Sequence, residues 1–248
     1  MTTTYFSPTV KVPVIQPTHV SEGSYKKIGN VDAYCVGRSN NKKAVIVSHD
    51  MMGFNPRSEQ LCDIIASQGF HVIMPYFFND EPYTIERIKR EGNFERFLWL
   101  SQAAPQEYVN KVIDIIITYL RSEGYREFGF FGASWGGKCA VFASHNSAFT
   151  AAVLVHVPWL NANDFKDTQC PVAILSSGDL RDLTPIVQAL KSTKPFARKI
   201  VHKRFPEARY GWVGALSNYS NPMIAELNTE TMRIAVTFFR ENIGVRNY

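Results

Sequence analysis

The sequence lacks the features that mark membrane-spanning, secreted and metal-dependent proteins. No apolar run approaches the roughly 20 residues needed to cross a bilayer, and the first residues do not join a basic region to an apolar core. The four cysteines are far apart and form no Cys-x-x-Cys pair, so neither a zinc site nor a disulfide framework is indicated (Cys35, Cys62, Cys139, Cys170). We expect an intracellular, cytoplasmic protein with no metal, no cofactor and no membrane partner.

The net charge is also modest, so the charge of the whole chain does not indicate a particular class of partner. The formal net charge is +5 over 248 residues, but seven basic residues gather in one stretch (Lys191, Lys194, Arg198, Lys199, Lys203, Arg204, Arg209). This stretch, the basic face from Lys191 to Arg209, lacks interleaved stacking aromatics and a nucleic-acid motif. It indicates a solvated surface or a contact with an acidic protein, such as a cytoskeletal polymer, rather than nucleic acid.

Two regions are expected along the chain. Residues 1–22 are rich in threonine, valine and proline and show no helical period, which predicts an extended N-terminal arm that contacts another protein. Residues 23–248 form one domain, because 45% apolar residues at this length can bury a single sizeable core.

Within that domain, short apolar strands alternate with amphipathic helices. Strands are predicted at 31–36, 43–48, 70–74, 151–157, 171–176 and 199–205, and helices after Asn55-Pro56, over 109–120 and near the C-terminus. Residues 79–104, with Phe94, Phe97 and Trp99, are expected to form a partly exposed helical excursion that packs over the core or covers a substrate. The alternation predicts an α/β fold with a mostly parallel sheet covered by helices on both faces.

The clearest motif is Gly132-Ala133-Ser134-Trp135-Gly136. It follows the apolar run Gly129-Phe130-Phe131 and continues into a helical segment, so Gly-x-Ser-x-Gly has the strand, turn and helix of a nucleophile elbow. Such a turn lifts one side chain above the sheet edge, and here that side chain is Ser134.

The chain resembles the dienelactone hydrolase family of α/β-hydrolases over about residues 24–242. Four stretches carry the resemblance in order: Ser48 to Phe54, Gln68 to Pro75, Gly132 to Lys138, and Phe205-Pro206 through Gly211-Trp212. The resemblance implies the α/β-hydrolase fold, a triad of Cys, Asp and His, and an oxyanion hole of backbone N–H groups acting on small esters or lactones. The oxyanion groups would belong to Met51 and Trp135.

Laid onto the family pattern, the triad has changed. Ser134 stands for the nucleophilic cysteine and Tyr210 for the catalytic histidine, while the acid is Asp182 or, alternatively, Asp179. Tyr76 stands where the family usually has aspartate. A serine hydroxyl needs a base more than a cysteine does, and tyrosine, with an ordinary pKa near 10, is a poor base at pH 7.

Three further residues could take part in the site. His156 and His49 end or follow strands near Ser134, so either could replace the missing base, or each could be held by hydrogen bonds to the backbone. Asp50 lies where the family often has an acidic residue near the nucleophile, or serves as a turn residue.

Two interpretations follow. In the first, the protein is a catalytically degenerate hydrolase that works as a binding or structural component of a larger protein assembly. In the second, it is an active serine hydrolase of small esters or lactones, with Ser134 as nucleophile and a displaced base.

Overall fold

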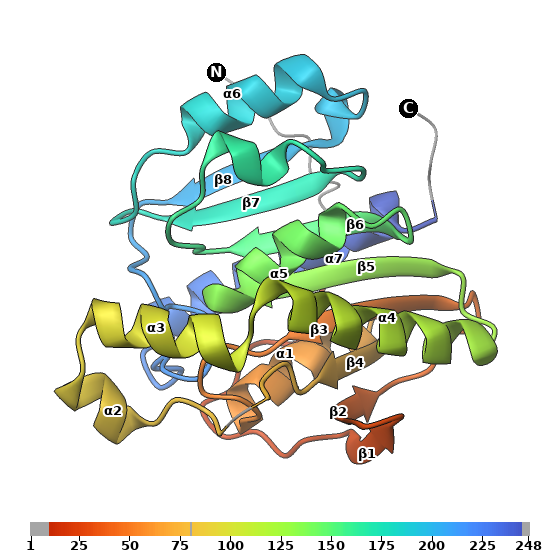
Figure 1. Ribbon diagram of the computed structural model, residues 1–248, viewed down its shortest axis with the longest axis horizontal. Coiled ribbons are helices and arrows are strands. Elements are labelled where there is room, and N and C mark those ends of the chain that lie inside the picture. The colour runs from red at the N-terminus through yellow and green to blue at the C-terminus, as the bar shows by residue number, and fades with distance from the viewer. Residues whose placement is uncertain (1–9, 80, 245–248) are drawn as a thin grey trace.

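The computed structural model describes residues 10–79 and 81–244, which are built around one eight-stranded sheet (Figure 1). The strand order is β1-β2-β4-β3-β5-β6-β7-β8. β2 pairs antiparallel with β1 and β4, and the other neighbouring strands are parallel. The strands are β1 (Ser24–Ile28), β2 (Val31–Val36), β3 (Lys43–Ser48), β4 (His71–Pro75), β5 (Glu127–Ala133), β6 (Phe149–Val155), β7 (Val172–Ser177) and β8 (Val201–Phe205).

Helices cover both faces of this sheet. One face packs against α4, α5 and α6, and the other packs against α1 and α7; Figure 1 shows α4 and α5 on the near side of the sheet and α7 behind it. The short helices α2 and α3 lie at one end of the sheet, outside these layers. The helices are α1 (Pro56–Ala66), α2 (Ile85–Arg90), α3 (Asn93–Ala103), α4 (Gln106–Ser122), α5 (Trp135–Ser144), α6 (Thr184–Thr193) and α7 (Pro222–Asn242).

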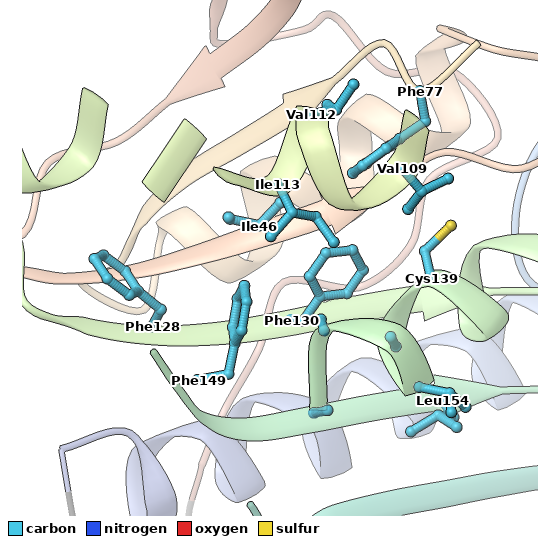
Figure 2. Close-up of a cluster of buried hydrophobic side chains, with 14 of the residues drawn as sticks. Ile46, Phe77, Val109, Val112, Ile113, Phe128, Phe130, Cys139, Phe149 and Leu154 are labelled. Carbon is cyan, nitrogen blue, oxygen red and sulfur yellow. The ribbon is translucent and has the colours of Figure 1, made fainter. Parts of the chain in front are cut away.

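The alternation of side chains along the central strands divides the core into two halves. Phe130 of β5 points towards α4 and α5 and packs with Ile46 and Val109, as Figure 2 shows. Its neighbour Phe131 belongs to the other half, with Met232 of α7. Because these strands are buried on both faces, they are continuous apolar runs.

The predicted α/β-hydrolase architecture is confirmed. The predicted N-cap of α1 is also present, since the Asn55 side chain accepts a hydrogen bond from the Ser58 backbone N–H at 3.0 Å. Two elements were not predicted. Strand β1 is mostly polar and exposed, and α6 carries only two buried residues, Val187 and Leu190.

Part of the expected N-terminal arm, residues 1–9, lies outside the described residues. Residues 10–22 contain no helix or strand and lie against the domain. Ile15 is buried, and its N–H donates to the Thr229 hydroxyl of α7 at 3.1 Å. His19 bonds the buried Asp63 carboxylate of α1 at 2.6 Å. These contacts hold this part of the arm to its own domain.

None of the helices in 10–79 and 81–244 is both long and apolar enough to cross a membrane.

Candidate functional site

Ser134 is raised at the sharp turn between β5 and α5. Its backbone has φ 58° and ψ −125°, a left-handed conformation that L-residues rarely adopt. The turn closes tightly, because a Cβ atom added at Gly132 would lie 1.9 Å from the Gly136 carbonyl oxygen. Such strain persists only where the surrounding fold enforces it. The elbow geometry expected from the motif is therefore present.

The hydroxyl of Ser134 meets the phenol of Tyr210. The two oxygens are 2.5 Å apart, and either can donate the hydrogen bond. Tyr210 lies in the loop between β8 and α7, and its side chain is 46% exposed. Thus the side chain of Tyr210 reaches the hydroxyl at the tip of the elbow directly.

Tyr210 remains protonated at neutral pH. Partial burial of the side chain raises its pKa, and this effect outweighs the hydrogen bond with Ser134, which lowers it. A protonated phenol can donate a hydrogen bond to Ser134 or accept one, but a base must take the proton away completely. The arrangement stabilises a neutral pair of hydroxyl groups.

Asp179, rather than Asp182, lies beside Tyr210. The Asp179 carboxylate accepts the Tyr210 backbone N–H at 2.9 and 3.1 Å, and it also accepts the Ser177 hydroxyl at 2.7 Å. Burial would raise its pKa, but these hydrogen bonds outweigh burial and lower it. The carboxylate thus positions the backbone of residue 210.

Asp182 has a different set of contacts. It accepts the backbone N–H and the hydroxyl of Thr184 at 2.9 and 2.7 Å, at the start of α6. These bonds lower its pKa. The spacing of the sequence left both aspartates open as the acid, and the structure brings only Asp179 to the loop of Tyr210.

The two histidines considered as substitute bases are held elsewhere. His49 is buried, with Nδ1 2.7 Å from the Asp50 carbonyl oxygen, and its Nε2 accepts the Phe77 backbone N–H at 2.9 Å. His156 is also buried, and its Nε2 donates to the Val213 carbonyl at 3.0 Å. Burial lowers the pKa of each to about 4, so both are neutral at pH 7.

His156 nevertheless lies near the Tyr210 ring. The two rings meet edge to face with their centroids 5.3 Å apart. Its Nδ1 is buried without a hydrogen-bond partner in the described part of the chain, and its backbone φ is 38°. His156 therefore packs against the Tyr210 ring, and its Nε2 bonds the Val213 carbonyl rather than Ser134.

The remaining four histidines are also described, and each has its own partner away from Ser134. His19 meets Asp63, His71 meets the Gly37 carbonyl, His145 meets the Asp164 carbonyl and His202 meets Ser176. The Ser134 hydroxyl thus has a phenol, and no imidazole, as its hydrogen-bonding neighbour.

Asp50 connects two loops at this edge of the sheet. Its carboxylate accepts the Met52 N–H at 2.9 Å and the Ala215 N–H at 2.7 Å, which joins the loop after β3 to the loop that carries Tyr210. Burial raises the pKa of Asp50 despite these hydrogen bonds. Its contacts are those of a residue that positions both loops.

The two residues expected to form an oxyanion hole lie on different elements. Trp135 is the first residue of α5, where a backbone N–H has no acceptor within the helix. Met51 lies in the loop after β3, and its carbonyl accepts the Tyr83 N–H at 2.9 Å. The positive end of α5 therefore lies directly behind Ser134.

Tyr76, the other departure from the family pattern, lies in an aromatic cluster around His49. Its ring centroid is 5.3 Å from those of both His49 and Phe54. An aspartate at this position would place a charge among aromatic rings. Tyr76 thus contributes to an aromatic neighbourhood beside the site.

Sequence reasoning missed Ser177, whose buried hydroxyl orients Asp179. Its only signal was its place at the end of β7, two residues before the aspartate. The described residues contain no group of three or more His, Cys, Asp or Glu side chains that could hold a metal ion.

Comparison with known proteins identifies the family of the chain. A model of the dienelactone hydrolase family matches residues 31–217. An uncharacterized AIM2 family protein of Schizosaccharomyces pombe is 25% identical over 222 residues, covering 87% of this chain and 90% of that protein. A carboxymethylenebutenolidase homolog of Mus musculus is 33% identical over 99 residues, 38% of each chain.

A solved structure shows the same fold. The dienelactone hydrolase of Anabaena variabilis superposes with a TM-score of 0.56 at 15% identity, over 89% of this chain and 97% of that one. Because the family model matches residues 31–217, and the eight-stranded sheet and the elbow at Ser134 are those of the fold, the chain belongs to the dienelactone hydrolase family.

Proposed function

We propose that this protein is a catalytically degenerate member of the dienelactone hydrolase family that works as a binding or structural component of a larger protein assembly. One observation carries the proposal: a tyrosine with a raised pKa, and no histidine, lies within hydrogen-bond distance of the Ser134 hydroxyl. Loss of one triad member lowers the rate by about 10⁴ to 10⁶. The remaining groups can bind a ligand, but none of them takes the proton from the serine hydroxyl.

The proposed contacts with other proteins are the N-terminal arm and the basic face from Lys191 to Arg209. Some charges of that face are already engaged, since Lys203 pairs with Glu230 at 2.8 Å and the Arg204 guanidinium donates to the Gly178 carbonyl at 2.6 Å. Lys191 and Arg198 have no comparable ion pair within the described part of the chain. They are the residues that support contact with an acidic protein surface in the cytoplasm, such as a cytoskeletal polymer.

A second function is favoured by a separate observation. The strained backbone of Ser134 and the helix terminus behind it are intact, and strain of this kind gathers at functional sites. In this alternative the protein is a serine hydrolase of small esters or lactones, with Ser134 as nucleophile, Asp182 or Asp179 as the acid and a displaced base.

Labelling with a fluorophosphonate probe separates the two functions. The probe phosphonylates a serine only when a base activates its hydroxyl. The degenerate function predicts that the intact mass of the wild-type protein remains unchanged, as does that of Ser134→Ala. Stoichiometric labelling of the wild type that is lost in Ser134→Ala would establish the hydrolase instead.

A further inference from the structure

A groove of about 490 Å³ lies between β8 and α7. None of its lining residues belongs to the candidate site. Its apolar lining comes from Phe205, Pro206, Met223 and Leu227. Three basic and three acidic residues also line it (Lys203, Arg204, Arg233, Glu207, Glu226, Glu230). The groove therefore carries no net charge, and its size suits a few side chains of a bound segment.

The charges of the groove are largely engaged with one another or with water. Lys203 and Arg233 both pair with Glu230, at 2.8 and 2.6 Å. Glu207 and Glu226 are exposed, so they stay solvated. A strongly charged occupant would disturb these arrangements, whereas an uncharged segment with apolar side chains would leave them intact.

The N-terminal arm leads towards this groove. Its later residues lie on α1, where His19 and the Glu22 N–H bond Asp63, and the earlier Ile15 N–H donates to Thr229 of α7. Across this face of the sheet, α1 contacts β2 and β4, α7 contacts β6 and β7, and β8 follows at the edge. The arm, read backwards from Ile15, thus leads away from α1 and towards β8. Thr229 itself lines the groove.

The residues before Ile15 stay on this side of the domain. Val10 and Val12 are partly buried against the half of the core that includes α7. Residues 1–9, which lie outside the described residues, have no charged side chain. They contain Tyr5 and Phe6, the only tyrosine, phenylalanine or tryptophan residues in the first 24 positions. The segment that precedes Val10 therefore has the composition that the groove fits.

The length of this segment also matches the groove. The part of α7 that lines it, from Met223 to Arg233, is about 15 Å long at 1.5 Å per residue. Five residues of extended chain span about 17 Å, so Tyr5 and Phe6 can reach any part of the groove from Val10.

We propose that the groove between β8 and α7 holds residues 5–9 of the same chain, with the side chains of Tyr5 and Phe6 packed on its apolar lining. Aromatic side chains supply most of the apolar area that so short a segment can bury. Val14 and Val20 remain 59% and 89% exposed, so that part of the arm is left for contact with another protein. The docking does not depend on whether Ser134 is active.

Chymotrypsin cleavage of the full chain tests the docking, because the protease reaches the bonds after Tyr5 and Phe6 only when this segment leaves the groove. Met223→Glu places a charge on the apolar lining at a residue that is 48% exposed, and an acidic residue suits the first turn of α7. We expect these two bonds, followed by intact mass, to be cut at least about tenfold faster in Met223→Glu than in the wild type. Phe97→Glu is the matched control, since Phe97 is 61% exposed on α3 and does not line the groove, and it should be cut like the wild type.

A crosslinking experiment tests the position of the segment. All four native cysteines are buried, so the thiols introduced in Ser7→Cys/Glu226→Cys are the accessible ones. They should form a disulfide within one chain on mild oxidation. Ser7→Cys/Phe97→Cys should form one far more slowly under the same conditions.

Three outcomes would overturn the proposal. The first is equal cleavage after Tyr5 and Phe6 in the wild type and in Met223→Glu, which would leave the groove to a different occupant. The second is a disulfide in Ser7→Cys/Glu226→Cys that forms no faster than in Ser7→Cys/Phe97→Cys. The third is a disulfide that joins two chains, at twice the mass of 28.1 kDa, since the occupant would then be the arm of a second copy.

Discussion

Replacing Tyr210 by histidine should restore part of a catalytic triad. At this position the Asp179 carboxylate already holds the backbone N–H at 2.9 Å, and the side chain reaches the Ser134 hydroxyl. An imidazole here would be able to take the serine proton at neutral pH. We therefore expect Tyr210→His to hydrolyse p-nitrophenyl acetate about a hundredfold faster than the wild type.

The expected gain is smaller than the full effect of a triad member for two structural reasons. A general base contributes about 10² to 10⁴ in rate. Imidazole is shorter than the phenol whose oxygen now lies 2.5 Å from Ser134, so its nitrogen falls short unless the loop shifts. In addition, Asp179 bonds the backbone and not the side chain of residue 210, so the ring is only partly oriented. We therefore expect a rate gain near the lower limit of this range, about 10².

Two variants make this assay decisive. Tyr210→Phe keeps the ring and removes the hydroxyl, and it should show no gain. Ser134→Ala combined with Tyr210→His should remove the gain, because the new base then has no nucleophile to activate. The reasoning is refuted if Tyr210→Phe abolishes an activity that the wild type has, since Tyr210 would then itself be the base. It is also refuted if Tyr210→His shows no gain although its imidazole lies within hydrogen-bond reach of Ser134.

Three further predictions concern stability. Burial lowers the pKa of His49 and of His156 from 6.5 to about 4, so their neutral forms stabilise the fold above pH 6.5 and this stability is lost as the pH falls to 4. The free energy of unfolding, measured in urea, should be lower at pH 4 than at pH 7 by about 3 kcal/mol per histidine. A variant lacking the His156 imidazole should show a smaller difference between the two pH values. Phe130→Ala opens a cavity in the core, because this side chain is fully buried, and should lower the free energy of unfolding by about 3 to 5 kcal/mol in the same assay. Gly132→Ala places a Cβ 1.9 Å from a backbone oxygen and should lower the thermal midpoint more than Gly69→Ala. At Gly69 the added Cβ meets no atom within 4 Å, so the only cost there is that of alanine at a positive φ.

The sequence predicted those features that depend on local pattern. Apolar runs located most strands, and the glycines around Ser134 predicted the elbow, because both follow from neighbouring residues in the chain. The sequence also drew attention to Tyr210, because the resemblance implies a histidine at this position. The direct hydrogen bond between the phenol and the Ser134 hydroxyl could not be predicted, because it depends on how two distant parts of the chain meet in the fold.

Other features depended on where individual side chains point, which the sequence pattern does not reveal. Asp179 and Asp182 are three residues apart, and only the turn after β7 decides which one approaches Tyr210 and which one bonds Thr184. Likewise, Phe94, Phe97 and Trp99 form one aromatic group in the sequence. The helical phase of α3 buries Trp99 and exposes the two phenylalanines, so the group divides between core packing and surface.

The most direct test of the account is the turnover of a small activated ester and of a simple lactone by the wild-type protein and by Ser134→Ala at pH 7. The absence of a base for Ser134 predicts that the two proteins hydrolyse both compounds at the same slow rate. A wild-type rate about a hundredfold or more above that of Ser134→Ala, the size of effect that a working general base provides, would contradict it.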